Sequence, residues 1–342
     1  MTMHTLAIVD PCCARGYTPD ALHAGGLGGT EATVLRVATA LATDMTILHY
    51  QCGRLVTEQT DAGVMHPFEN AFTPGLVATI VVINAWKVAC KLRKVQPDAR
   101  IILWLHIHPG RHNRPMAQAL AATGVEVICV SASHAASLRR FLADGPPLAI
   151  DHIHNPIAPG LMPDGTAHDP DRLLFASSPH KGLAQVFARF RAARAAIPSL
   201  TLAVADPGYL VWETGPVPEG VTFLGPLPHA DLIAQMRRAL CLFYPQTTFA
   251  ETFGLVMAEA QAVGLPVLAH DTLGANAEVV TDTGQLLDAG DDARILARLR
   301  AWRDVRPVVR GNPAFALTAV CDRWRKLLAA PARAEISLEK VA

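Results

Sequence analysis

The sequence has few aromatic side chains and no net charge. Aromatic residues make up 6% of the 342 residues although 51% are hydrophobic, so the apolar content is largely aliphatic. Such a composition suits helices that pack on a buried parallel sheet, and it excludes a disordered chain. The 30 basic and 30 acidic residues cancel. This balance argues against a protein that binds DNA or RNA mainly by neutralising phosphates.

The sequence also lacks paired cysteines and long apolar runs. Its seven cysteines are scattered without a CxxC pair, which argues against zinc ribbons and thioredoxin-like redox motifs and is typical of a reducing cytosol. The first apolar run, residues 6–9, is too short for the core of a signal peptide. The longest, residues 76–90, is interrupted by Asn84 and Lys87, whereas a membrane-spanning helix needs about 20 apolar residues. We therefore expect a cytoplasmic protein without a transmembrane helix.

Short apolar runs alternate with helix-like segments along the chain. In the first half, runs rich in β-branched residues occur at residues 5–10, 45–50, 78–84, 99–106 and 125–131. A segment beginning at His152 is rich in Pro, Gly and Asp and predicts a linker, after which a second series of such runs follows. Buried runs joined by helical segments are typical of parallel sheets with crossover helices. The pattern predicts an α/β protein made of two doubly wound halves.

The segment from Tyr244 to Val280 carries the most specific pattern. Glu251 lies in a loop after an apolar run, and Glu259 lies within a predicted helix that opens near Phe253 and Gly254. Eight residues of helix span about 12 Å, a length similar to that of a nucleotide-sugar. The two carboxylates could hold hydroxyls at the two ends of such a ligand, with the N–H groups of the helix start on its diphosphate. The alternative is two exposed acids near a helix start, where acids are favoured.

The string ETFGLVMAEAQAVGLPVLA, residues 251–269, resembles the E-x7-E signature of retaining glycosyltransferases of family 4, which have the GT-B fold. The resemblance continues through GANAEVV, residues 274–280. It implies two Rossmann-like domains that face each other across a cleft. Residues 1–155 would form the acceptor-side domain and residues 156–312 the nucleotide-sugar-binding domain. A C-terminal helix in residues 313–342 would cross back to the N-terminal domain.

The same resemblance assigns roles around the E-x7-E segment. It implies that Glu251 orients hydroxyls of the transferred sugar and that Glu259 holds the ribose. The backbone at Phe253, Gly254 and Leu255 would receive the diphosphate, and a glycine at the second of these positions removes a Cβ where a phosphate must come close.

Two further segments resemble loops of that family. AGGLGGTEATVL, residues 24–35, is similar to its N-terminal glycine loop, so Gly28 and Gly29 are expected to let the backbone approach the donor phosphates or the acceptor. The alternative for this loop is a tight turn between a strand and a helix.

The second of these segments, FASSPHKGL, is similar to the phosphate-binding loop of the family. Lys181 matches the lysine of that loop and is expected to act in catalysis. Ser177 and Ser178 stand in the region where the family usually has an arginine, so hydroxyl and backbone donors are expected to replace one cation. The alternative for Lys181 is a solvated side chain at a helix start.

The tripeptide that ends at His106 resembles the strand of the family that precedes a catalytic-region histidine. By this resemblance, His106 would lie near the 6-hydroxyl region of the transferred sugar. The residues alone leave open a metal site made by His106, His108 and His112. The resemblance instead implies an enzyme that needs no metal and no other cofactor.

The resemblance implies a retaining hexosyltransferase that moves a hexose from a UDP- or GDP-sugar to a hydroxyl of a lipid or saccharide acceptor. Glycolipid, lipopolysaccharide or exopolysaccharide synthesis would be its setting. Another GT-B enzyme, such as a sugar-nucleotide epimerase, and a non-catalytic nucleotide-sugar-binding protein remain alternatives. A basic cluster formed by Lys87, Lys91, Arg93 and Lys94 predicts either a solvated helix face, as such runs usually are, or peripheral contact with an anionic membrane.

Overall fold

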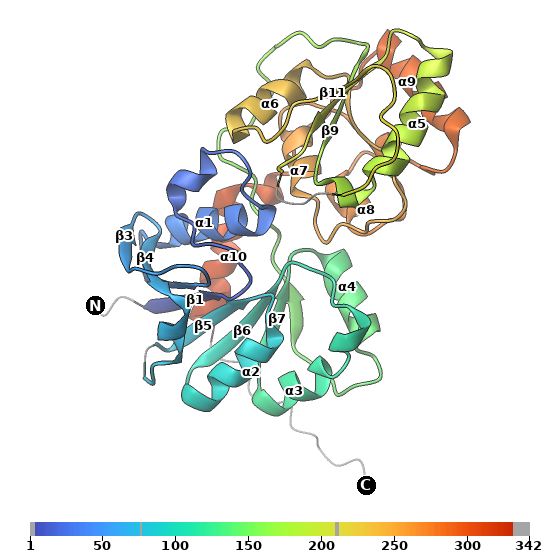
Figure 1. The fold of residues 1–342 in the computed structure, drawn as a ribbon. Helices are drawn as coiled ribbons and strands as arrows, with labels where there is room; N and C mark the ends of the chain where they lie inside the picture. The colour runs from blue at the N-terminus through green and yellow to red at the C-terminus, as the bar shows by residue number, and fades with distance from the viewer. Residues whose placement is uncertain (1–3, 76, 209–211, 331–342) are drawn as a thin grey trace. The chain divides into compact units, whose positions relative to one another are not determined.

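The computed structural model describes residues 4–75, 77–208 and 212–330. Contacts between Cα atoms divide the chain into two compact units. Unit 1 contains the chain up to Thr18, the segment Val37–His154 and the chain from Val320 on. Unit 2 contains Pro19–Arg36 and Asn155–Ala319. Each unit has its own largely parallel sheet (Figure 1), so the predicted α/β class with two parallel-sheet domains is confirmed.

Within the described residues, the sheet of unit 1 has eight strands in the order β3-β4-β2-β1-β5-β6-β7-β8. The strands are β1 Thr5–Asp10, β2 Thr46–Gln51, β3 Glu58–Thr60, β4 Gly63–Pro67, β5 Thr79–Ile83, β6 Arg100–Leu105, β7 Glu126–Cys129 and β8 Ile150–His152. Only the β3–β4 pair in this sheet is antiparallel. Because β1 pairs with β2 on one side and β5 on the other, the strand order reverses between β1 and β5. Ligands of doubly wound sheets bind outside the carboxyl ends of the strands at such a reversal.

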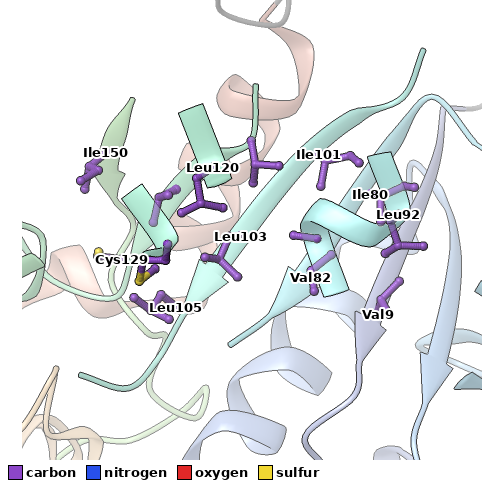
Figure 2. Packing of buried hydrophobic residues seen from close by; sticks show 14 of the residues in the cluster. Val9, Ile80, Val82, Leu92, Ile101, Leu103, Leu105, Leu120, Cys129 and Ile150 are labelled. Carbon is purple, nitrogen blue, oxygen red and sulfur yellow. The ribbon is translucent and has the colours of Figure 1, made fainter. Parts of the chain in front are cut away.

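Helices with apolar faces cover this sheet. They are the second part of α1 Gly29–Leu41, then α2 Trp86–Val95, α3 Met116–Thr123, α4 Ala132–Phe141 and α10 Leu317–Ala329. Val82 and Leu103 on neighbouring strands pack in one buried cluster with Leu92 of α2 and Leu120 of α3 (Figure 2). Ser131 caps α4 by accepting the His134 N–H at 2.9 Å, which satisfies one of the backbone donors that a helix start leaves open.

In the part of the chain that the structure describes, the sheet of unit 2 has six parallel strands in the order β11-β10-β9-β12-β13-β14. The strands are β9 Arg172–Ala176, β10 Thr201–Ala205, β11 Val221–Phe223, β12 Cys241–Tyr244, β13 Val267–His270 and β14 Leu286–Leu287. Its helices, besides the start of α1, are α5 Leu183–Ala196, α6 His229–Arg238, α7 Leu255–Ala262, α8 Asn276–Val279 and α9 Asp292–Asp304. Here β9 lies between β10 and β12, so the reversal falls at the loops that follow β9 and β12.

Short 3-10 helices lie in the connections of both units. They are η1 Pro19–Leu22, η2 Phe68–Phe72, η3 Arg111–Asn113, η4 Pro179–Lys181, η5 Thr283–Gln285 and η6 Pro313–Phe315. No helix in the described ranges is both long and apolar enough to cross a lipid bilayer.

The glycine-rich loop groups with unit 2, although it precedes most of unit 1 in the sequence. Gly25 forms an isolated bridge with Pro228, and a Cβ at Gly25 would lie 3.2 Å from the carbonyl carbon of Leu227. The absence of a side chain therefore lets this backbone pack closely on unit 2. Unit 1 therefore lacks Pro19–Arg36, which the expected domain of residues 1–155 includes. Unit 2 also contains η6 and the start of α10.

The packing of α10 in unit 1 predicts the effect of removing its tryptophan. Trp324 contacts Trp104 edge to face with ring centres 4.6 Å apart, and both side chains are buried. We expect Trp324→Ala to lower the free energy of unfolding by about 3–5 kcal/mol, because it leaves a large cavity. Urea denaturation followed by circular dichroism measures this change. The exposed Leu55 gives the control Leu55→Ala, expected within about 0.5 kcal/mol of wild type, and a similarly small loss for Trp324→Ala would contradict the prediction.

Candidate active site

The Glu251 carboxylate is held by two side chains. Lys181 Nζ lies 3.1 Å from each carboxylate oxygen, and the Tyr244 hydroxyl donates a hydrogen bond to Oε1 at 2.9 Å. The Glu251 side chain is only 7% exposed. A charge-assisted pair with a further hydrogen bond has a well-defined geometry. The sequence therefore places a negative charge at a fixed position in the loop between β12 and α7.

Gly274 fixes the backbone of the same glutamate. Its φ is +58°, and a Cβ there would lie 2.5 Å from the Glu251 carbonyl oxygen and 2.6 Å from its nitrogen. The following Ala275 N–H donates to the Glu251 carbonyl at 2.9 Å. Only glycine combines this backbone conformation with so close an approach. The segment 274–280 thus supports the backbone on which the Glu251 side chain depends.

Lys181 comes from the loop that follows β9. The next residue, Gly182, has a φ of +93°, and a Cβ there would lie 2.6 Å from the Cβ of the buried Gln246. Gln246 in turn accepts the Phe249 N–H at 2.8 Å and fixes the loop after β12. Lys181 Nζ lies 4.7 Å from the centre of the Phe249 ring. The two loops at the reversal of the unit 2 sheet are therefore packed together, which brings the lysine and Glu251 into contact.

The start of α7 lies beside this pair. Gly254 precedes the helix with a φ of +91°, and the first helical bonds run from the N–H groups of Met257 and Ala258 to its carbonyl. The N–H groups of Leu255 and Val256 therefore have no carbonyl partner within the helix. Such groups and the helix dipole favour an anion at this end.

A second carboxylate lies further along α7. Glu259 Oε1 is 3.0 Å from Arg36 Nη1 and 3.1 Å from His229 Nε2, and the side chain is 5% exposed. Burial alone would raise the pKa of Glu259, but the hydrogen bond with His229 and the charge of Arg36 outweigh it and hold the pKa below its usual value. The carboxylate is therefore ionised at neutral pH.

These groups line one pocket in unit 2. The pocket brings together nine residues singled out from the sequence: Gly28, Gly29, Ser177, Ser178, Lys181, Glu251, Gly254, Leu255 and Glu259. Phe253 lies outside its lining, because the ring is buried against Phe315 with ring centres 5.0 Å apart. It supports the loop through packing, and its side chain does not face the pocket.

Sequence reasoning missed three polar residues that line the pocket, namely Arg36, Asp206 and His229. Arg36 lies in α1 and also donates to the Pro156 carbonyl at 3.2 Å. His229 is the first residue of α6. An arginine on a predicted helix and a histidine near a helix start carry no distinctive pattern, so nothing in the sequence marks them.

His106 belongs to unit 1 and follows β6. Its backbone N–H donates to Asn84 Oδ1 at 2.7 Å, and its ring centre lies 4.7 Å from that of Trp104. Burial, helped by His134, lowers the pKa of His106 to about 3, so the ring is neutral at physiological pH. His108 packs edge to face on His134 at 4.9 Å, and His112 Nε2 lies 3.1 Å from the Asn113 amide.

The basic cluster is divided by the structure. Arg93 donates to the carbonyls of Thr123 and Ala99 at 2.9 and 2.6 Å, so it connects α2 to the end of α3 and to the residue before β6. Lys87, Lys91 and Lys94 are exposed on α2. The exposed charge is therefore made by lysines alone.

Comparison with solved structures defines the class of fold. The chain superposes on AviGT4, a glycosyltransferase involved in avilamycin A biosynthesis, with a TM-score of 0.59 and 17% identity, covering 96% of this chain and 99% of that one. It superposes on WaaG, a glycosyltransferase involved in lipopolysaccharide biosynthesis, with a TM-score of 0.62 and 12% identity, covering 96% and 100%. The protein thus has the GT-B fold. Residues 174–304 match the family of glycosyl transferases group 1.

Characterised relatives align with part of the chain. A phosphatidyl-myo-inositol mannosyltransferase of Propionibacterium freudenreichii is 35% identical over 136 residues, which are 37% of this chain and 34% of that protein. A D-inositol 3-phosphate glycosyltransferase of Corynebacterium efficiens is 40% identical over 78 residues, which are 22% and 18% of the two chains. The aligned part is about a third or less of the length of these relatives.

The clamp on the Glu251 backbone gives a prediction. We expect Gly274→Ala to displace the Glu251 loop and lower the free energy of unfolding by more than about 1 kcal/mol, since it adds a clash to an unfavourable φ. The matched control is Gly215→Ala, because Gly215 also has a positive φ of +73° but nothing lies within 4 Å of its Cβ position. Urea denaturation of both variants separates the clash from the backbone effect, and equal losses would contradict the clamp.

Proposed function

We propose that this protein is a retaining hexosyltransferase that uses a nucleotide-diphosphate sugar, with UDP or GDP as the leaving nucleotide. The observation that carries this proposal is the Lys181–Glu251 pair beside the start of α7, with Glu259 in the same pocket. Acidic acceptors for sugar hydroxyls and donors for a diphosphate thus line one pocket. The group 1 domain supports the same assignment.

In this proposal Glu251 accepts hydrogen bonds from hydroxyls of the transferred hexose. Its charge is balanced by Lys181, and its oxygen accepts the Tyr244 hydroxyl. In this role the carboxylate orients the substrate, and it is not proposed to attack the anomeric carbon. Glycoside hydrolysis would need a second carboxylic acid at defined spacing across the scissile bond.

The departing nucleoside diphosphate gains negative charge as the glycosidic bond breaks. Lys181 and the N–H groups of Leu255 and Val256 stabilise that charge, because they are in place before the reaction begins. Glu259 accepts hydrogen bonds from the ribose. Arg36 and His229 hold that carboxylate ionised and fixed, and they are positioning residues for the ribose.

The acceptor is a hydroxyl of a lipid or saccharide. The names of two relatives contain inositol phosphate or phosphatidyl-inositol, which supports glycolipid synthesis as the setting. His106 holds the 6-hydroxyl region of the hexose as a neutral ring. The reaction is proposed to need no metal or other cofactor. Membrane contact through Lys87, Lys91 and Lys94 stays a prediction, and a solvated helix face is the more usual role of such lysines.

Glu251→Gln tests the reaction. The amide keeps the size of the side chain but removes its charge, so we expect kcat for sugar transfer to fall by about 10²–10³ while the protein stays folded. Mass spectrometry of the acceptor measures transfer, with UDP- and GDP-hexoses as donors and phosphatidylinositol and inositol phosphate as acceptors. Interconversion of the donor without a mass shift on any acceptor would favour an epimerase, and binding without turnover a non-catalytic protein.

The control is Glu219→Gln, since this exposed glutamate of unit 2 pairs with Arg194 and does not line the pocket. It is expected to leave transfer unchanged. Transfer near the wild-type rate in Glu251→Gln would overturn the assigned site.

Glu259→Gln tests the ribose end of the pocket separately. We expect it to weaken binding of the free nucleoside diphosphate by about tenfold or more, because a charged hydrogen-bond acceptor is lost. Isothermal titration calorimetry with UDP and GDP measures the Kd. An unchanged Kd for the nucleotide that binds the wild type would show that Glu259 serves the fold alone.

A further inference from the structure

Asn84 has a backbone conformation that non-glycine residues rarely adopt. Its φ is +57°, and it is the single non-glycine residue with a positive φ in the described ranges. The Ala85 N–H donates to the Ile83 carbonyl at 2.6 Å across it. A three-residue turn of this kind with a positive φ at its centre is rare and strained. Strained residues persist only where the surroundings hold them, and they concentrate at functional sites.

Two hydrogen bonds hold Asn84 between the ends of β5 and β6. Its N–H donates to the Trp104 carbonyl at 3.0 Å. Its side-chain Oδ1 accepts the His106 N–H at 2.7 Å. The backbone on both sides of Leu105 is therefore attached to this one residue, and the second of these bonds needs the amide side chain.

The attachment bears directly on the His106 ring. That ring is buried against Trp104, so a shift of the backbone at the end of β6 would move the ring with it. Trp104, which contacts the His106 ring, is also the residue whose carbonyl accepts the Asn84 N–H. Loss of the Asn84 acceptor would remove a short hydrogen bond to the backbone of His106, the first residue after the strand.

The place in the fold agrees with a functional origin of the strain. Asn84 follows β5, one of the two strands at which the order of the unit 1 sheet reverses. The loop after β1, the other strand, reaches it, because Cys12 Sγ lies 3.8 Å from the Ile83 carbonyl. Ligand sites of doubly wound sheets form at this reversal. Glycine takes a positive φ without strain, but only a side chain such as that of Asn84 adds an acceptor for the His106 N–H.

We propose that Asn84 is a positioning residue that uses its strained turn and its side-chain oxygen to hold His106 in the orientation needed for hexose transfer. The inference rests on the proposed function. Asn84 has two relevant properties, the positive φ and the acceptor oxygen. The acceptor oxygen is the one that holds the His106 N–H.

Three substitutions separate these properties. Asn84→Gly keeps the backbone conformation and removes the acceptor, Asn84→Asp keeps an acceptor and tolerates the conformation, and Asn84→Ala loses both. We expect Asn84→Gly to lower kcat about tenfold or more, because the short hydrogen bond to the His106 backbone is lost. The KM for the nucleotide-sugar should stay within about twofold of wild type. Asn84→Asp should restore kcat to within about threefold of wild type, since its carboxylate accepts the same N–H.

A second measurement does not depend on activity. Hydrogen exchange of the His106 amide should be faster in Asn84→Gly than in wild type, and slow in Asn84→Asp, because protection follows the hydrogen bond. The control is Gln96→Ala. Gln96 is a buried amide that accepts the Gly75 N–H at 3.0 Å just before β6 begins, at the opposite end of that strand, so its loss should lower stability and leave kcat unchanged.

The outcomes are distinct. Unchanged kcat in Asn84→Gly, or a loss in Asn84→Asp as large as in Asn84→Gly, would overturn the inference. A fall in kcat that Gln96→Ala reproduces would also overturn it, because the role would then be general stability. If Glu251→Gln retains transfer, the proposed function fails; if Glu251→Gln is inactive and Asn84→Gly is fully active, only the role of Asn84 fails.

Discussion

The ion pair between Lys181 and Glu251 sets the requirements for much of unit 2. A nearly buried carboxylate is costly unless a cation and further donors accompany it. Lys181 and Tyr244 supply these partners, and the approach of Gly274 fixes the backbone behind them. The lysine can reach the glutamate only because the loops after β9 and β12 pack together through Gly182 and Gln246. The lysine, the glutamate and the two glycines are thus all needed to place the charge of Glu251.

Both units place special residues by the same rule of sheet topology. In unit 2 the reversal brings the loops after β9 and β12 together, with the ion pair between them. In unit 1 the reversal lies between β1 and β5, and the strained Asn84 follows β5 directly. Parallel strands end at one edge, so residues distant in sequence meet there without long loops. The pattern explains why motif residues follow apolar runs in this chain.

The sequence predicts the strands and the E-x7-E segment well, because both depend on local pattern. Residues 5–10 form a strand with those bounds, and the helix predicted to open near Gly254 begins at Leu255. The β3–β4 hairpin and α9 give weak signals: the hairpin strands are short, and α9 is largely polar on its exposed side. Arg36 and His229 could not be predicted as partners of Glu259, since their meeting depends on tertiary packing. The positive φ of Asn84 likewise accompanies hydrogen bonds to the end of β6. Such long-range bonds cannot be predicted from the local sequence.

The serines that replace the usual arginine show how the charge balance of the pocket differs from the expectation. Ser178 is buried with its hydroxyl 3.0 Å from His180 Nδ1, so this hydroxyl already has a partner within the loop. Arg36 supplies a second cation, but it is paired with Glu259, and Lys181 is paired with Glu251. Each cation thus faces a carboxylate before a donor binds. On the proposed function, the positive potential that attracts a diphosphate must therefore come largely from the backbone N–H groups at the start of α7. Unlike Lys181 and Arg36, these N–H groups are not paired with Glu251 or Glu259. This dependence makes Gly254, which opens that helix start to the pocket, as important to donor binding as the charged residues.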